Sequence, residues 1–166
     1  MNDIEIDFSM YSGVPVIEPK IWSNNGNKYK SCFLLFDTGA CMTAMSVVLA
    51  DSLGYKRVRN KSSEAGSIGG SKKAKYAIIP DMKIGNFSLG PIASWVIDFE
   101  ESLTTNLILG MNVIKHFNIN MTFNANSYSK GVITMSPRFS IHDIKSLDDF
   151  DIDYSMFGIY NLTKKP

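Results

Sequence analysis

Apolar and β-branched residues occur along the chain in short runs that Gly, Asn and Pro residues interrupt. Runs of this kind are typical of β-strands, so the pattern predicts a mostly β fold. Residues 14–17 and 20–22 lead into an Asn-Gly pair at Asn25 and Gly26. Asn-Gly pairs favour the positive φ angles of a tight hairpin, and residues 29–36 are then the returning strand.

Two segments carry a helical pattern instead. Residues 44–53 place apolar side chains at helical spacing and end before Gly54, which suits the C′ position of a helix. Residues 111–117 predict one or two helical turns, because their apolar residues share one face. Alternation then resumes, and a turn into residues 132–135 predicts a closing β-hairpin. The sequence therefore predicts one or two short helices within a β fold.

A polar, glycine-rich segment at residues 56–74 precedes an apolar strand at residues 76–79. This predicts a long hairpin with Ile68, Gly69 and Gly70 at its tip. One interpretation is a flap that closes over a substrate and excludes water. The alternative is a surface hairpin with no ligand.

Composition narrows the function classes. The 166 residues fit one domain, and 17 basic residues nearly balance 16 acidic ones, so bulk charge predicts neither nucleic-acid nor membrane binding. The start of the chain has no signal-peptide pattern and no apolar run is long enough to cross a bilayer, so we expect a cytoplasmic protein.

Cys32 and Cys41 are expected to be free, buried or half-buried thiols, because the cytosol is reducing. No metal or cofactor is expected, because His116 and His142 lack partners at metal-ligand spacing.

Candidate chemistry lies at the end of the predicted strand 29–36, where Asp37, Thr38 and Gly39 follow an apolar run. Two carboxylates that face each other across a water molecule and share one proton can hydrolyse a peptide bond without a metal. Gly39 allows close backbone approach and offers an N–H to the carboxylate, and the Thr38 hydroxyl can bond to an opposite loop. Ala40 offers no hydroxyl donor, which favours a pH optimum nearer neutral than that of pepsin.

The order of motifs resembles the retropepsin-like aspartic protease family, in particular its cellular and bacterial members. Residues 35–40 contain the Asp-Thr-Gly triplet, a helix and a Gly-rich hairpin follow, and residues 108–114 read Ile-Leu-Gly-Met-Asn-Val-Ile. The similarity spans about residues 14–137. It implies a closed acid-protease β-barrel with a hairpin flap, in which Leu109 and Gly110 pack under the catalytic loop.

The resemblance also implies roles for individual residues. Asp37, Thr38 and Gly39 would be catalytic. The substrate would lie against six residues of the catalytic loop and the flap: Ala40, Cys41, Met42, Ile68, Gly69 and Gly70. Viral members typically carry an acidic residue at the position of Cys41 and an arginine at that of Met111, so their cleavage preference does not transfer to this chain.

The triplet occurs once, whereas the chemistry needs two carboxylates. The sequence therefore predicts an aspartic endopeptidase that acts on protein or peptide substrates as a homodimer. The resemblance implies residues 4–8 and the closing hairpin as candidate interface strands, because the termini of retropepsins often interleave. Residues 1–136 would form the protease domain and residues 137–166 an extension that enlarges the interface, occupies the cleft or is a surface appendage. A peptide-binding or dimerisation module without activity, and a domain that cleaves only itself, remain alternative functions.

Overall fold

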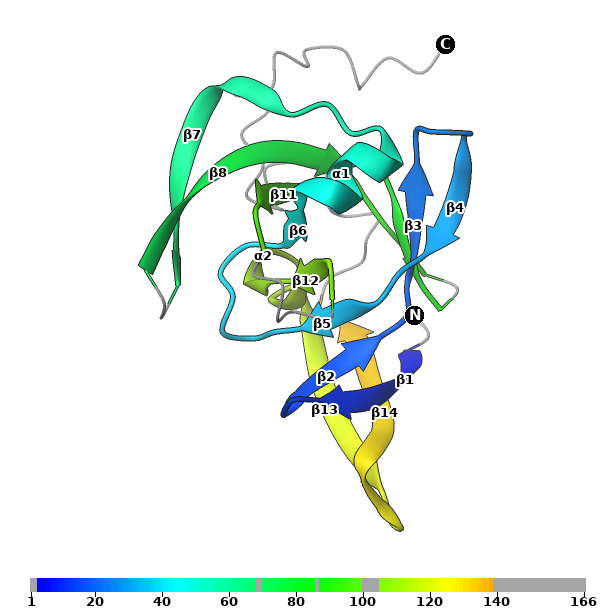
Figure 1. The fold of residues 1–166 in the computed structure, drawn as a ribbon. Helices are drawn as coiled ribbons and strands as arrows, with labels where there is room; N and C mark the ends of the chain where they lie inside the picture. The colour runs from blue at the N-terminus through cyan, green and yellow to red at the C-terminus, as the bar shows by residue number, and fades with distance from the viewer. Residues whose placement is uncertain (1–2, 68–69, 86, 100–104, 139–166) are drawn as a thin grey trace.

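The computed structural model describes residues 3–67, 70–85, 87–99 and 105–138. Fourteen strands and two short helices form this part of the chain, which confirms the mostly β prediction (Figure 1). In chain order they are β1 (Ile4–Tyr11), β2 (Val14–Ile17), β3 (Lys20–Ser23), β4 (Lys28–Ser31), β5 (Leu34–Phe36), β6 (Ala44–Ser46), α1 (Val47–Leu53), β7 (Val58–Ser67), β8 (Gly70–Ile79), β9 (Met82–Ile84), β10 (Phe87–Leu89), β11 (Ile92–Ile97), β12 (Leu107–Leu109), α2 (Met111–Ile114), β13 (Phe117–Asn124) and β14 (Ser127–Pro137).

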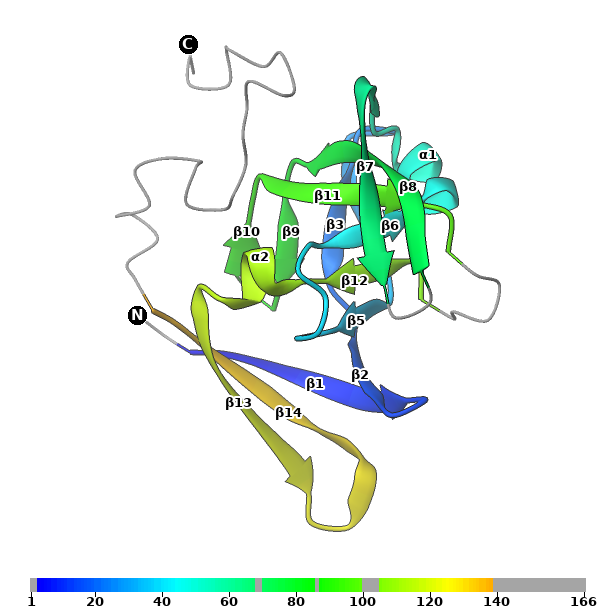
Figure 2. The same ribbon diagram turned by 90° about the vertical axis from the view of Figure 1, so that its left-hand side faces the viewer.

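The strands form two sheets, and the larger one does not close into a barrel. Ten strands follow the order β13-β14-β1-β2-β5-β12-β6-β11-β8-β7, and four follow the order β10-β9-β3-β4. A barrel requires the first and last strands of a sheet to pair. Here the β13–β14 hairpin projects from one end of the molecule and the β7–β8 hairpin lies at the other (Figure 2). The expected closed barrel is therefore corrected to an open sheet.

The first hairpin forms where the sequence places it. Gly26 and Asn27 have φ angles of 87° and 47°, and Trp22 pairs with Tyr29 across β3 and β4. The single returning strand expected at residues 29–36 is divided, because β4 ends at Ser31 and β5 begins at Leu34. The break lets β4 remain in the small sheet while β5 enters the large one.

The helix expected at residues 44–53 begins later than its pattern indicates. Residues 44–46 form β6, which pairs with β11 and β12, and α1 starts only at Val47. The Ser46 side chain caps α1 by accepting a hydrogen bond from the Leu49 N–H (3.0 Å), and Gly54 ends it with a φ angle of 73°. Residues 44–46 are therefore a strand and not part of the helix, because hydrogen bonding to strands on both sides stabilises them more than the helical spacing of their side chains would.

Side chains from both sheets fill one core. Ile21, Met82 and Ile84 of the smaller sheet belong to the same buried cluster as Leu34 and Leu107 of the larger sheet. Each side chain of this size stabilises the fold by about 1.5–3 kcal/mol when it is fully buried. The core therefore fixes β5 and β12, which carry the candidate site.

Within the described residues, no helix is long and apolar enough to span a membrane.

Candidate active site

The parallel pairing of β5 with β12 brings the two sequence motifs together. Leu34 lies opposite Leu107 and Phe36 opposite Leu109, so Asp37 and Gly110 follow at the same end of neighbouring strands. The Asp37 N–H continues the pairing by donating to the Leu109 carbonyl oxygen (3.2 Å). Asp37 is half-buried, above a strand whose three residues are all buried.

The turn after β5 orients the Asp37 carboxylate. The Gly39 N–H donates to Asp37 Oδ1 (2.8 Å), as the sequence predicts, and the Ala40 N–H donates to the Asp37 carbonyl oxygen (3.3 Å). A Cβ atom at Gly39 would lie 3.2 Å from Asp37 Oδ1, closer than ordinary contact. Glycine therefore suits this position, because a side chain would press on the carboxylate oxygen that the turn holds.

Backbone hydrogen bonds fasten the following loop to α2. The Met111 N–H donates to the Ala40 carbonyl oxygen (2.7 Å), and the Asn112 N–H donates to the Cys41 carbonyl oxygen (3.0 Å). Gly110 lies directly beneath the loop, since a Cβ atom there would fall 2.3 Å from the Met42 carbonyl carbon. The packing role expected for Gly110 is thus explained by close approach of two backbone segments.

Asn112 and Thr43 also hold the loop, and our sequence analysis does not identify either of them. Asn112 Oδ1 accepts hydrogen bonds from the Thr43 N–H (2.7 Å) and Thr43 Oγ1 (2.9 Å), while its Nδ2 donates to the Ala93 carbonyl oxygen (3.0 Å). Thr43 Oγ1 in turn accepts from the Gly110 N–H (3.3 Å). Both side chains are buried. The sequence does carry one signal for Asn112, which is the only amide in the apolar run around α2. Buried polar groups in proteins are almost always hydrogen-bonded, so an amide in such a run indicates a side chain with buried hydrogen-bond partners.

Replacing Asn112 by Ala is expected to lower the free energy of unfolding by about 2–4 kcal/mol, because Thr43 and Ala93 would keep buried polar groups without partners. Chemical denaturation of the variant measures this loss. Asn118, which is exposed on β13, provides the matched control, and its replacement by Ala is expected to change stability little. Equal stability of the two variants would contradict the role given to Asn112.

The other expected site residues are distributed as follows. Thr38, Gly39 and Cys41 are exposed, and Met42 is half-buried. The predicted long hairpin is confirmed as β7 and β8, in which Ser67 pairs with Gly70. Ile68 and Gly69 lie outside the described residues, as do residues 139–166. The flap interpretation therefore remains a prediction.

The two cysteines are free, as expected, but they differ in exposure. Cys41 is exposed, which corrects the expectation of a buried or half-buried thiol, whereas Cys32 is partly buried. Burial, with a smaller contribution from the negative charge of Glu18, raises the pKa of Cys32 to about 12. A thiol with a raised pKa holds its proton and reacts slowly at neutral pH, because the thiolate is the nucleophile.

We therefore expect thiol reagents at neutral pH to modify Cys41 rapidly and Cys32 slowly in the folded protein. The fraction of Cys32 thiolate should grow only as the pH approaches 12, whereas denaturant should make both thiols reactive at once. Peptide mapping after timed alkylation measures both rates. Equal rates for the two thiols in the native protein would disprove the assignment.

The described residues contain no group of three or more His, Cys, Asp or Glu side chains that could hold a metal ion. A pocket of about 460 Å³ lies at the base of the β7–β8 hairpin, and its lining residues (Tyr55, Lys56, Arg57 and Lys75) include none of the expected site residues. The pocket is therefore separate from the Asp37 turn.

Comparisons with known proteins identify a family and a similar fold. Residues 24–116, more than half of the chain, match the model of a family described as "gag-polyprotein putative aspartyl protease". A retropepsin-like aspartic protease from Rickettsia conorii has a similar fold, with a TM-score of 0.56 and 19% identity over 80% of this chain and 92% of that one. An EIAV protease in complex with an inhibitor aligns with a TM-score of 0.47 and 18% identity, over 64% of this chain and 91% of its own. No curated protein sequence matches.

Proposed function

Because the chain belongs to the gag-polyprotein aspartyl protease family, we propose that it is an aspartic endopeptidase whose active site is shared by two copies of the chain. The observation that carries the proposal is the setting of Asp37. Its backbone is fixed by the Leu109 carbonyl and its carboxylate by the Gly39 N–H, and the residues around it hold no second catalytic triplet. One chain thus supplies one of the two carboxylates that the reaction needs.

In the proposed reaction, the two copies of Asp37 face each other and share one proton. The ionised carboxylate takes a proton from a water molecule, which attacks the carbonyl carbon of the scissile peptide bond. The protonated carboxyl group donates its proton to the carbonyl oxygen, and the tetrahedral intermediate collapses with proton transfer to the leaving amine. The Gly39 N–H keeps Asp37 Oδ1 in place during these transfers.

Thr38 is suited to a contact between the two copies. Its side chain is exposed, and no described group makes a hydrogen bond with its hydroxyl. A hydroxyl next to the two-fold axis can donate to the opposite loop and accept from it, which would lock the paired turns. This assigns to Thr38 the bond between loops that the sequence predicts.

The proposed interface also includes the β13–β14 hairpin. Residues 4–8 lie in β1 and pair on one side with β14, whereas β2 pairs only with residues 9–11, so no described strand pairs with the other edge of residues 4–8. Among the described strands, β13 is the end strand on this side of the sheet and has a free edge. Exposed aromatic side chains at Phe123 and Tyr128 lie on this hairpin. Both expected interface segments therefore offer a strand edge to a second copy, and the hairpin adds exposed aromatic side chains.

Substrate is proposed to lie along Ala40, Cys41 and Met42, whose backbone is held by α2, and beneath the tip formed by Ile68, Gly69 and Gly70. Cys41 and Met42 offer apolar, polarizable side chains that adapt to different substrate shapes. This arrangement favours apolar residues next to the scissile bond.

Cleavage of an unbiased peptide library, followed by mass spectrometry with and without a statine-type inhibitor, tests the proposal. Inhibitor-sensitive products with apolar residues beside the cleavage point are expected, and sedimentation should show dimers at active concentrations. Binding of extended peptides without cleavage at any pH would instead support an inactive peptide-binding module. Cleavage by a strictly monomeric species would overturn the shared site.

A further inference from the structure

Positive charge is concentrated on the β7–β8 hairpin and the segment that leads into it. Seven of the 17 basic residues lie within residues 56–75, which contain one acidic residue, Glu64. The seven are Lys56, Arg57, Arg59, Lys61, Lys72, Lys73 and Lys75. Since the net charge of the chain is only +1, the remainder is acidic on balance. This asymmetry favours an acidic ligand for the hairpin.

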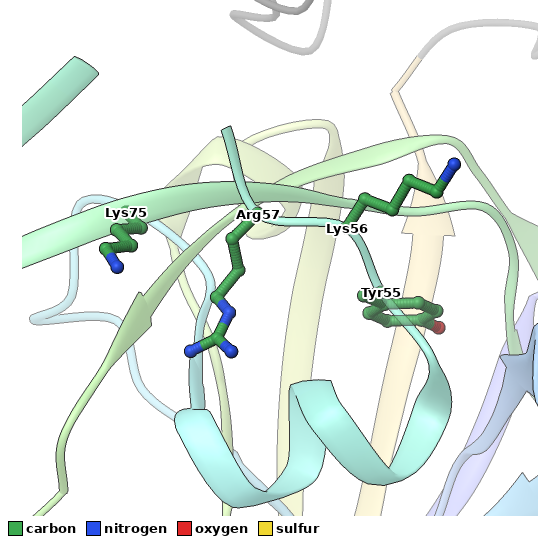
Figure 3. Close-up of a pocket in the computed structure, with 4 residues that line it drawn as sticks. All are labelled: Tyr55, Lys56, Arg57 and Lys75. Atoms are coloured by element: carbon green, nitrogen blue, oxygen red, sulfur yellow. The ribbon is translucent and has the colours of Figure 1, made fainter. Parts of the chain in front are cut away.

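The pocket at the base of the hairpin collects part of this charge. It is lined by Tyr55, Lys56 and Arg57 from the segment between α1 and β7, and by Lys75 from β8. Figure 3 shows Arg57 pointing toward α1 with Lys75 farther to the left, while Lys56 extends past Tyr55 on the right. The pocket of about 460 Å³ is large enough for one or two carboxylate side chains.

Only one of these cations has a described carboxylate partner. Arg57 Nη2 lies 2.7 Å from Asp51 Oδ1 of α1. Within the described residues, Lys56 and Lys75 form no ion pair, and both are exposed, as is Lys73 farther along the hairpin. The two lysines therefore add positive charge that no described carboxylate offsets, and a ligand with several carboxylates would neutralise this charge.

A simpler explanation is that the charges protect a sheet edge. β7 is the last strand of the large sheet, and lysines on edge strands discourage pairing with other chains. That explanation requires charge along β7 but no charged pocket. It leaves unexplained why Lys56 and Arg57, which precede β7, and Lys75, which lies on the inner strand β8, line one pocket.

The chain itself contains a segment of matching chemistry. Asp149, Asp151 and Asp153 alternate with apolar residues, so in an extended conformation their carboxylates would share one face at a spacing of about 7 Å. Ten residues link Arg138, the last described residue, to Asp149 and span up to about 35 Å. A compact domain of this size has a radius of gyration of about 14 Å and so a diameter of about 36 Å, which is about the length that the extended linker spans.

We propose that the pocket formed by Tyr55, Lys56, Arg57 and Lys75 binds the acidic segment 149–153 of this chain. Covalent connection gives the segment a high effective concentration, so weak individual ion pairs suffice for occupancy. If the hairpin covers substrate, as in the proposed function, the bound segment restrains the hairpin and lowers peptidase activity. Binding itself does not depend on that function and is tested without an activity assay.

Zero-length carbodiimide crosslinking of the full chain provides the first test, because it joins only amines and carboxylates in contact. Crosslinks from segment 149–153 to Lys56 and Lys75 are expected to exceed those to Lys28 and Lys130 by about tenfold at low salt. They should largely disappear at about 0.5 M salt. Crosslinks spread evenly over all lysines, or absent from the pocket, would overturn the proposal.

A titration provides the second test. A labelled peptide of residues 147–155 is added to the full chain in which Asp149, Asp151 and Asp153 are all replaced by Asn, which vacates the pocket. In this background, Lys56→Gln with Lys75→Gln is expected to weaken binding by about tenfold or more, whereas the control pair Lys28→Gln and Lys130→Gln should not. Equal binding to both variants would contradict the site. Equally tight binding of a scrambled peptide, in which the Asp residues no longer alternate, would show that this segment is not its specific ligand.

Discussion

Replacing Asp37 by Asn is expected to lower kcat/KM for peptide cleavage by at least about a thousandfold, because proton transfer by positioned acids and bases contributes up to about 10⁴-fold. An amide cannot take a proton from water at neutral pH or share one with its partner. It does preserve the oxygen that accepts the Gly39 N–H and leaves the Asp37 backbone bond to Leu109 unchanged. Kinetics on a peptide substrate measure the loss.

The control for this variant is Asp3→Asn, which removes the same charge from an exposed position outside the expected interface strands. It is expected to retain wild-type activity, and both variants should retain the wild-type circular dichroism spectrum and dimer fraction. An Asp37→Asn enzyme that cleaves as well as the wild type would refute the proposed chemistry. A variant that fails to dimerise would show that the carboxylate holds the assembly together.

The second large effect is expected at Gly110. Its replacement by Ala would place a Cβ atom 2.3 Å from the Met42 carbonyl carbon and 2.7 Å from the Thr43 nitrogen. Both neighbours are backbone atoms of the loop that follows Asp37, so the clash cannot be relieved by a side-chain rotation. We expect a loss of about 3 kcal/mol in unfolding free energy, together with a fall in activity as the loop is displaced.

Gly13→Ala supplies the comparison for Gly110. Gly13 has a φ angle of 83° and nothing within 4 Å of the position of its missing Cβ, so Ala there costs only the strain of the backbone conformation, about 1 kcal/mol. Thermal and chemical denaturation of the two variants separate steric exclusion from backbone strain. If the Gly110→Ala variant is no less stable than the Gly13→Ala variant, the result would contradict close packing of Gly110 against the loop that follows Asp37.

Features that depend on local chemistry could be predicted from the sequence. The Asn25-Gly26 pair correctly marks the first hairpin, and Gly54 correctly marks the end of α1. In both cases a few adjacent residues restrict the backbone, so little information from distant parts of the chain is needed. The nearness of Asp37 to Gly110 is different, because it depends on the parallel pairing of β5 with β12, and only the family resemblance predicts it.

Features that depend on tertiary pairing could not be predicted. Residues 44–46 have helical spacing but form β6, because two strands from distant parts of the chain pair with them. The open edge at β13 and the split between β4 and β5 likewise arise from which strands meet.

The role of Asn112 depends on both kinds of information. Its burial follows from an apolar run, but its partners Thr43 and Ala93 are set by the fold. The tip at residues 68–69 and the extension at residues 137–166 stay predictions.

Mixing subunits tests the central claim, that each active site takes one Asp37 from each of two chains. A fixed amount of wild-type chain is mixed with an equal amount of Asp37→Asn chain, under conditions in which dimers exchange their subunits. Because random pairing puts half of the wild-type chains into mixed dimers, activity per wild-type chain should fall to about one half, and further excess of the variant should abolish it. Activity per wild-type chain that stays constant at every mixing ratio would contradict a shared site.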